Sequence, residues 1–306
     1  MGVIGDLLNS LCQSILTICV TVIATMGISL IFKTSNTTNF AQGTIGALGC
    51  YLVANLLVNW CPNLPVVVGI LIGVVAGVLL GLLIDIGIFR RGKNVNAIGK
   101  QIITMGIVTL IIGGIPLIFG TMPAPQLLPF VEGNFTFDVG GTTVSITKHS
   151  LVCLAITVVI LAVLFVLLYK SKWGLGVRAT AANESTAGII GINTYVITAT
   201  SWAIAAGLVV LASVMFTAGN ATLNSTFMTQ IQVNAFLGGI LGGFSTFYGP
   251  IIGAVIIPVV TAIVGWIGIY ADFFQKWCDV IVYVFLLIAV LIKPQGLFGK
   301  KVVKKV

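Results

Sequence analysis

Charged residues are scarce in this sequence, and their scarcity limits the kinds of protein it can encode. Asp, Glu, Lys and Arg make up only 7% of the 306 residues, whereas soluble domains carry about 25%. Hydrophobic residues make up 58%, too many for the few charged side chains to shield from water. A soluble globular protein is therefore excluded, and we expect an integral membrane protein.

Groups that carry out catalysis or bind metals are also scarce. The single histidine, His149, falls at an expected membrane boundary, and the sequence has neither an HExxH nor a GxSxG motif. The six cysteines include no CxxC pair and lie mostly in apolar segments, so they predict neither a disulfide framework nor a zinc site. We expect no catalytic residues, no metal and no bound cofactor. A membrane enzyme stays an alternative that only a detected chemical conversion would support.

Long apolar runs fill most of the chain, and as helices they can cross a bilayer core of about 30 Å. Transmembrane strands need only about ten residues of alternating hydrophobicity, and runs such as LVCLAITVVILAVLFVLL do not alternate. We predict an all-α integral membrane protein, a polytopic helical bundle of about eight to ten spans with broken or re-entrant helices, in one domain over residues 1–306. The runs lie at about residues 7–32, 41–59, 64–89, 101–120, 149–169, 195–218, 231–267 and 277–292.

The basic residues indicate how the spans are oriented. The net charge of +8 could attract nucleic acid, but the basic residues gather at the ends of apolar runs, which is the positive-inside pattern. We therefore expect a lipid membrane and no nucleic acid as partner, with the C-terminus and a loop at about 170–194 in the cytoplasm. A loop at about 121–148, with FTFDVGGTTVSIT as a short hairpin, should lie outside, and the side of the N-terminus stays open. The basic clusters are Arg90, Arg91, Lys93 and Lys100; Lys170, Lys172 and Arg178; and Lys293, Lys300, Lys301, Lys304 and Lys305.

The run at 231–267 is too long for one span, and a single crossing would put the basic tail outside. The run must cross twice or enter and return, and LGGILGGFSTFYGP offers the break. Irregular backbone at membrane depth is tolerated only where protein or a water-filled cavity covers it. We therefore predict that the glycines of this break shape a translocation pathway: Gly238, Gly239, Gly242 and Gly243.

Another polar interruption, KTSNTTNFAQGTIGALG, separates the first two apolar runs at residues 33–49. Such a break ends one helix and begins another, whose free backbone N–H groups can face an anionic part of a solute. This interpretation assigns Asn39, Gln42 and Gly43 to the pathway. An ordinary cytoplasmic turn capped by Asn39 explains the same residues, and both interpretations stay open.

The long loop KSKWGLGVRATAANESTAGIIGIN at residues 170–193 predicts a short amphipathic helix. Its small and apolar residues from Ala179 to Ile190 fall at helical spacing, with Arg178, Asn183 and Glu184 on or near the polar side. A helix this apolar in a cytoplasmic loop needs a partner surface. A loop helix lying on the membrane would have a similar pattern.

This loop resembles the cytoplasmic coupling segment of ABC-importer permeases, especially in its closing Gly191, Ile192 and Asn193. NFAQGTIGALGCY, NAFLGGILGGFSTFYGPIIGA and KPQGLFG are similar to segments of the branched-chain amino acid permeases, in the same order. The resemblance covers essentially the whole chain. It includes one departure, since FRRGKNVNAIGK stands where that family often has a stretch rich in arginine and proline.

The resemblance implies a permease subunit that moves branched-chain amino acids across the bacterial cytoplasmic membrane. Such a subunit pairs with a second homologous permease, two ABC ATPase subunits that bind ATP and Mg, and an extracytoplasmic solute-binding protein. Because of the departure, urea, short amides and nucleosides stay alternative solutes, and so does a partner-free channel or facilitator for small neutral solutes. The implied ATPase-coupling residues are Arg178, Asn183, Glu184, Gly191, Ile192 and Asn193.

Overall fold

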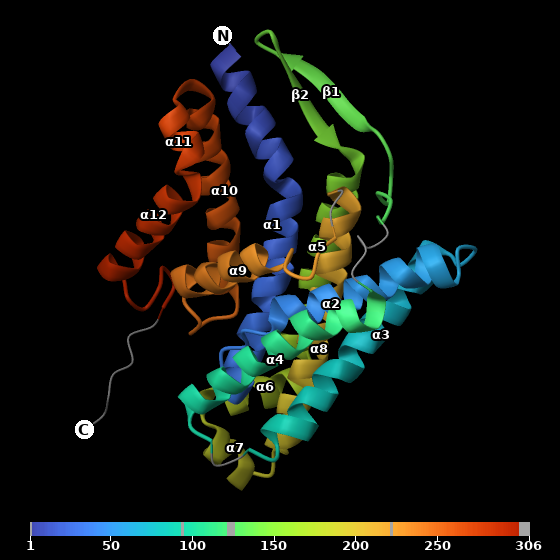
Figure 1. Cartoon of the computed structure of the whole chain (residues 1–306). Helices are drawn as coiled ribbons and strands as arrows, with labels where there is room; N and C mark the ends of the chain where they lie inside the picture. The colour runs from blue at the N-terminus through green and yellow to red at the C-terminus, as the bar shows by residue number, and fades with distance from the viewer. Residues whose placement is uncertain (1, 93–94, 121–125, 221–222, 300–306) are drawn as a thin grey trace.

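The computed structural model describes residues 2–92, 95–120, 126–220 and 223–299. Some residues named above lie outside these ranges, namely Lys93, the four lysines after residue 299 and the first five residues of the predicted outer loop. Within them the chain is a bundle of helices with one two-stranded hairpin (Figure 1). The expected polytopic helical bundle is therefore confirmed.

Each predicted apolar run contains a helix, and seven helices in the described ranges are long and apolar enough to cross a membrane. α12 is apolar but shorter, with 15 residues. η1 and η2 are π-helical turns that extend α2 and α3. The elements are α1 Gly2–Ser35, α2 Gln42–Asn55, η1 Leu56–Trp60, α3 Val66–Ile84, η2 Asp85–Phe89, α4 Ala97–Phe119, β1 Asn134–Val139, β2 Thr142–Thr147, α5 Lys148–Lys170, α6 Lys172–Ala182, α7 Glu184–Ile189, α8 Thr194–Gly219, α9 Thr229–Gly242, α10 Tyr248–Tyr270, α11 Asp272–Lys276 and α12 Cys278–Ile292.

Polar residues outside the apolar runs begin several of the helices. Their side-chain oxygens accept the backbone N–H of a residue three positions later, which satisfies one of the donors left free in a first helical turn. These N-caps fix where α4, α5, α6, α7 and α8 begin. The capping residues are Asn96, Thr147, Ser171, Asn183 and Asn193.

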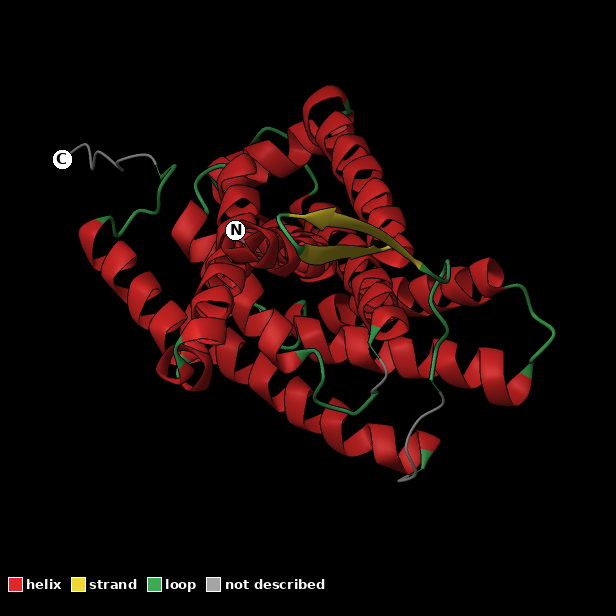
Figure 2. Ribbon diagram, turned by 90° about the horizontal axis from the view of Figure 1, so that it is seen from above, coloured by secondary structure: helices red, strands yellow, loops and turns green. Residues whose placement is uncertain are grey.

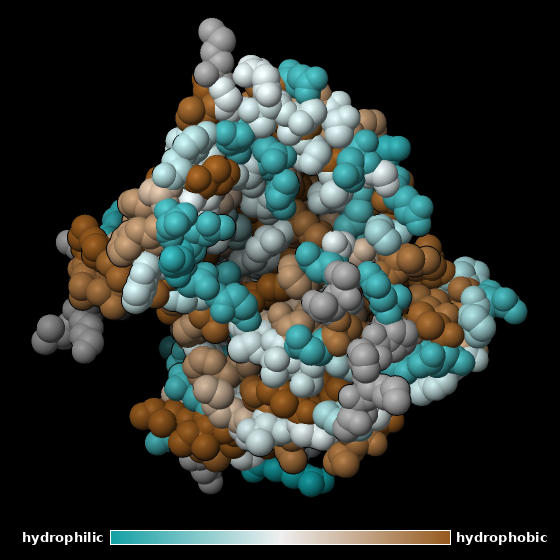
Figure 3. Space-filling view, turned by 45° about the horizontal axis from the view of Figure 1, so that its top comes forward, coloured by the Kyte–Doolittle hydropathy of each residue, from teal (hydrophilic) through white to brown (hydrophobic). Residues whose placement is uncertain are grey.

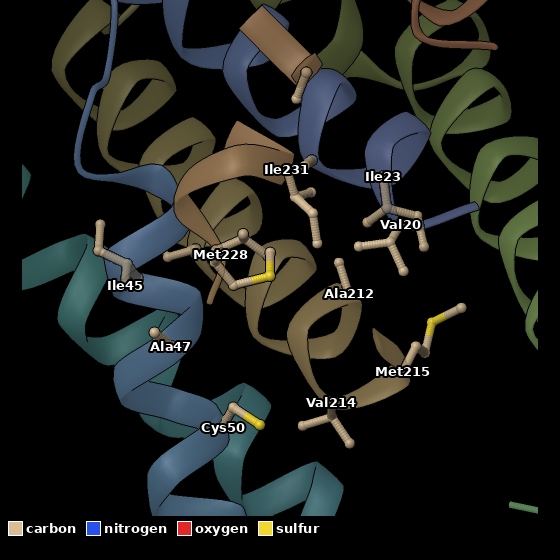
Figure 4. Close-up of a cluster of buried hydrophobic side chains, with 14 of the residues drawn as sticks. Val20, Ile23, Ile45, Ala47, Cys50, Ala212, Val214, Met215, Met228 and Ile231 are labelled. Carbon is tan, nitrogen blue, oxygen red and sulfur yellow. The ribbon is translucent and has the colours of Figure 1, made fainter. Parts of the chain in front are cut away.

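The centre of the molecule is built by α1 and α8, which pack along each other and contact most other helices. Residues 19–31 of α1 are all buried. Figure 4 shows Ile23 of α1, Ala212 of α8 and Ile231 of α9 in one cluster of buried side chains. Small residues let the backbones of α1 and α8 come close. At Gly27, for example, an added methyl group would lie only 3.3 Å from the Ala205 carbonyl oxygen of α8.

The N-terminal end of α1 lies beside the hairpin. With 34 residues, α1 is about 51 Å long, so it extends past a bilayer core of about 30 Å. The Ser145 N–H donates to Asn9 Oδ1 (3.1 Å), and Thr142 Oγ1 donates to the Gly2 carbonyl (3.2 Å). Figure 2 looks onto this end, with the hairpin next to the N-terminus, and α7 lies at the opposite end in Figure 1. The hairpin itself was predicted and is confirmed as β1 paired with β2.

The long run at 231–267 reverses direction inside the protein, as the topology argument required. α9 has 14 residues, fewer than the roughly 20 that a full crossing needs, and residues 243–247 turn the chain into α10. Lys33 Nζ at the end of α1 donates to the Ser245 carbonyl of this turn (2.9 Å). α10 then returns to the hairpin end, where Tyr270 OH donates to Asp6 Oδ2 (2.5 Å).

Gly253→Ala tests the close approach of α10 to α9. A Cβ at Gly253 would lie 2.0 Å from the Gly238 carbonyl oxygen, whereas one at Gly265 in the same helix would meet nothing within 4 Å. Overpacking against backbone costs about 1–3 kcal/mol, so Gly253→Ala should lower the thermal unfolding midpoint of the purified protein in detergent. Gly265→Ala is the control, and it should leave the unfolding midpoint unchanged or raise it, because alanine favours a helix more than glycine does. Equal midpoints for both variants would contradict the packing described here.

Candidate functional site

At the first predicted break, the amide side chains of Asn39 and Gln42 form hydrogen bonds with each other and with the backbone. Asn39 and Gln42 are both buried, at 3% and 1% exposed. Asn39 Nδ2 donates to Gln42 Oε1 (2.9 Å), and Asn39 Oδ1 accepts the Ala41 N–H (2.9 Å). Gln42 Nε2 in turn donates to the Ala205 carbonyl of α8 (2.7 Å). The start of α2 is therefore fastened to the central helix through Gln42.

A residue that the sequence analysis missed, Gln232 of α9, joins the first break to α9. Its Oε1 accepts the Gly43 N–H, and its Nε2 donates to the carbonyl oxygens of Phe40 and Asn39. The signal that could have found it is an amide inside an apolar run, in TQIQVNAF. We call the group of Asn39, Gln42, Gly43 and Gln232 the amide junction.

The amide junction bears on both interpretations of the first break. The Gly43 N–H, which would face a solute if the break bound an anionic group, is taken by Gln232 in this conformation. Asn39 does form a turn, but it bonds the N–H of Ala41, and the N-cap position of α2 is Ala41 itself. A role of these residues in the pathway stays a prediction, and it requires the junction to open.

The four predicted glycines lie together where α9 meets α10. A Cβ on Gly238 or Gly242 would meet backbone of α10, at 2.8 Å from Ala254 and 1.8 Å from Gly249. Gly239 makes room for the ring of Phe244 in the turn. Gly243 has φ +91°, a conformation that glycine adopts without strain. These glycines permit the reversal of the chain, and their effect on a solute pathway stays a prediction.

The C-terminal segment KPQGLFG covers the end of α9. The Leu297 N–H donates to the Leu241 carbonyl (2.7 Å) and the Phe298 N–H donates to the Gly242 carbonyl (3.1 Å). Carbonyls at a helix end have no partner within the helix, and in lipid an unsatisfied carbonyl is costly. The tail therefore completes the break between α9 and α10.

The predicted helix in the loop at 170–193 is two helices, α6 and α7, and the expectation of one helix was wrong. Asn183 interrupts it in an extended conformation (φ −164°, ψ 109°), and its Oδ1 accepts the Thr186 N–H to start α7 (3.0 Å). Asn side chains favour such caps over helix interiors. α7 is followed by Gly191 with φ +89°, and Asn193 then caps α8 through the Val196 N–H (3.3 Å).

This loop presents apolar side chains that nothing in the described part of the chain covers. Ile189 is 83% exposed and Ile190 is 68% exposed, and Glu184 of α7 is exposed as well.

Arg178 differs from the other predicted coupling residues, because it is held by contacts within the chain. Its guanidinium lies 5.4 Å from the Tyr169 ring, and its Nε donates to the Gly174 carbonyl (3.4 Å). The exposed isoleucines suit contact with another protein.

A shallow groove of about 250 Å³ adjoins this apolar surface. It runs between α6 and the start of α8, so it contains Ile192 and Asn193 of the predicted set. Its other lining residues are Lys172, Leu175, Gly176, Val196 and Ile197. Within the described ranges no group of three His, Cys, Asp or Glu side chains is placed to hold a metal ion.

Gln42→Ala tests the amide junction. The substitution leaves Asn39 Nδ2 buried without a partner, which costs about 1–3 kcal/mol, and it removes the bond from Gln42 Nε2 that ties α2 to the Ala205 carbonyl of α8. The thermal unfolding midpoint in detergent should fall clearly. Gln101→Ala is the matched control, because the Gln101 side chain forms no hydrogen bond within the described residues. A Gln42→Ala midpoint equal to that of Gln101→Ala would contradict the role given to the junction.

Comparison with known proteins gives the family of this chain. The model of the family described as branched-chain amino acid transport system / permease component matches residues 10–291. The probable branched-chain amino acid transport permease protein LivH of Methanocaldococcus jannaschii is 26% identical over 288 residues, which are 91% of this chain and 88% of the relative. The high-affinity permease LivH of Escherichia coli K12 is 24% identical over 294 residues, 92% of each chain.

A further relative, the high-affinity branched-chain amino acid transport permease BraD of Pseudomonas aeruginosa, is 27% identical over 184 residues, 60% of this chain and 57% of the relative. No solved structure matches the chain. The family match runs from α1 into the last turn of α12 and includes both breaks and the loop with α6 and α7. The chain therefore belongs to the family of branched-chain amino acid transport system permease components.

Proposed function

We propose that this chain is the transmembrane permease subunit of an ABC importer that moves branched-chain amino acids across a cytoplasmic membrane. The observation that carries the proposal is the exposed pair of Ile189 and Ile190 at the end of α7, in a chain whose family consists of permease components. A permease driven by separate ATPases needs such a contact surface, whereas a self-sufficient channel does not. The chain itself then has no ATPase site, and ATP and Mg bind the ATPase subunits.

The distribution of charge supports one orientation in the membrane. Five of the seven carboxylates lie at the hairpin end, while most described lysines and arginines lie toward the end that holds α7 (Figure 1). By the positive-inside rule the α7 end is cytoplasmic. The N-terminus and hairpin are then extracytoplasmic, and the chain after α12 is cytoplasmic. The carboxylates at the hairpin end are Asp6, Glu132, Asp138, Asp272 and Asp279.

α8 links the proposed ATPase contact to the two breaks. It begins at the Asn193 cap directly after α7 and extends for 26 residues to Gly219. Its Ala205 carbonyl holds Gln42, and through the amide junction it is connected to Gln232 of α9. Packed helices shift as units when an interface changes. Movement of the ATPases against α6 and α7 would therefore displace α8 and open or close the junction, which gives alternating access.

The solute assignment rests on the relatives, whose names specify branched-chain amino acids. The spans offer amides and backbone dipoles for a solute and few fixed charges. Most selectivity would then lie in an extracytoplasmic solute-binding protein, with a second permease and two ATPases completing the complex. Urea, short amides or nucleosides are the alternative solutes, and a partner-free facilitator is the alternative mechanism.

Purification and reconstitution test the proposed function. The tagged chain should copurify in mild detergent with ATPase subunits and a second permease, and the complex in vesicles should take up L-leucine only with ATP and the binding protein. Uptake of urea, acetamide and a nucleoside in the same vesicles compares the alternative solutes. If solute entered without ATP through the chain alone, the facilitator would replace the importer.

Replacing Ile189 and Ile190 with serine should separate the chain from the ATPases. Buried apolar anchors dominate the binding energy of most interfaces, so the double variant should retain at least about tenfold less ATPase during purification. Phe137→Ser is the control, because Phe137 is an exposed apolar residue (44%) on β1 at the opposite end. If the isoleucine variant recovered as much ATPase as the wild type, α7 would not be part of the ATPase contact.

A further inference from the structure

A cavity of about 530 Å³ opens at the hairpin end of the molecule. It lies between α1, the segment before β1, the end of β2, the start of α5 and the end of α8. Its volume falls in the range of about 300–1,000 Å³ typical of small-molecule sites. Figure 3 tilts this end forward and shows a hollow bordered by hydrophilic residues. None of the residues predicted for the pathway or the coupling loop lines this cavity.

The cavity is closed where it meets the core. A Cβ on Gly219 of α8 would lie 2.4 Å from Leu16 Cδ2 of α1 and 3.0 Å from the His149 ring of α5, so the three helices meet there without room for a methyl group. Below this contact lie buried core residues, among them Cys19 and Met215. A solute in the cavity would reach a closed floor and could not pass further in this conformation.

His149 forms hydrogen bonds through both of its ring nitrogens. His149 Nδ1 accepts the Phe130 N–H (3.1 Å), so this nitrogen carries no proton. Nε2 lies 2.9 Å from the Met215 carbonyl oxygen and donates to it. Both nitrogens of the imidazole are therefore used in holding the segment before β1 against α8.

Glu132 is the one formally charged side chain among the described residues that line the cavity. It is exposed, and within the described part of the chain its carboxylate receives no hydrogen bond and no ion pair. The nearby Lys148 ammonium lies over the Phe135 ring, 5.3 Å from its centroid. The remaining wall combines amides with apolar side chains, namely Gln13, Asn134, Asn220, Leu16, Pro129 and Val131.

We infer that this cavity is a receiving site for a zwitterionic amino acid, in which Glu132 binds the α-ammonium group. The amides supply donors for the α-carboxylate, and Leu16 and Val131 supply an apolar wall for the side chain. A hydrogen bond between an ammonium and a carboxylate is charge-assisted, so it is stronger than one between neutral groups. The other carboxylates of the hairpin end disfavour acidic solutes. The inference rests on the proposed importer and narrows its solutes, since urea and short amides carry no ammonium.

Two native cysteines allow a direct binding test on the purified importer complex without its binding protein. Cys12 lines the cavity and is half-buried, whereas Cys61 is exposed in the segment between η1 and α3. L-leucine should slow alkylation of Cys12 by a maleimide and leave the rate at Cys61 unchanged. N-acetyl-leucine, which lacks the ammonium, should protect Cys12 at least about tenfold less well, as expected when a charged hydrogen bond is lost.

Glu132→Gln and Asp138→Asn form a matched pair for the role of the carboxylate. Both remove an exposed carboxylate near the hairpin, but Asp138 does not line the cavity. Glu132→Gln should raise the leucine concentration that protects Cys12 by about tenfold or more, and Asp138→Asn should leave it unchanged. In vesicles supplied with leucine-loaded binding protein and ATP, only Glu132→Gln should reduce the uptake rate.

Several results would overturn the inference. One is that L-leucine does not protect Cys12 from alkylation. Another is that N-acetyl-leucine or urea protects Cys12 as well as L-leucine does. A third is that Glu132→Gln and Asp138→Asn change protection and uptake to the same extent. If uptake were ATP-driven and insensitive to Glu132→Gln, the receiving site would be wrong while the importer would stand. If the wild-type complex took up no amino acid at all, the proposed function would fail.

Discussion

A chain in lipid must satisfy its backbone hydrogen bonds from within, and this protein has two places where its helices cannot do so. At the first break the amides of Asn39 and Gln232 supply partners for the N–H groups of Ala41 and Gly43 and for the Phe40 carbonyl. At residues 243–247 the tail supplies them, through the N–H groups of Leu297 and Phe298. The arrangement of α2, α9 and α10 around α1 depends on these two solutions, because they satisfy backbone groups that the helices leave free at the breaks.

Close helix packing makes the same arrangement possible. Gly238, Gly242 and Gly253 bring α9 against α10 at distances that exclude a methyl group. Without a hydrophobic driving force between helices in lipid, such contacts and interhelical hydrogen bonds are what hold them together. Thr25 of α1 adds one such bond to the Ala235 carbonyl of α9 (3.0 Å). Interfaces of this kind adopt discrete packings and not a continuum, as the alternating access proposed above would require.

Helix α8 connects the loop with α6 and α7, the amide junction and the floor of the cavity at the hairpin end. Asn193 fixes its start behind α7, and Gly219 fixes its end beside His149 at the closed floor of the outer cavity. Between them, the Ala205 carbonyl binds Gln42 of the amide junction. In the proposed mechanism, a displacement of α8 along or about its axis would change the loop with α6 and α7, the amide junction and the cavity floor together. A single rigid helix would then couple events on the two sides of the membrane.

The sequence by itself determined the membrane class, the helical spans, the hairpin and the family. The evidence lay in the apolar runs, the basic clusters and the order of the segments, and span length and loop charge are local properties of a sequence. The sequence also located both breaks, but it misassigned one helix at Asn183, where a cap outweighed helical spacing. The contact of the N-terminal end of α1 with the hairpin, the pairing of Gln232 with Gly43 and the cavity beside Glu132 came only from the tertiary structure. Each of these depends on groups that are distant in sequence and meet only when the helices pack, so no local pattern could have indicated them.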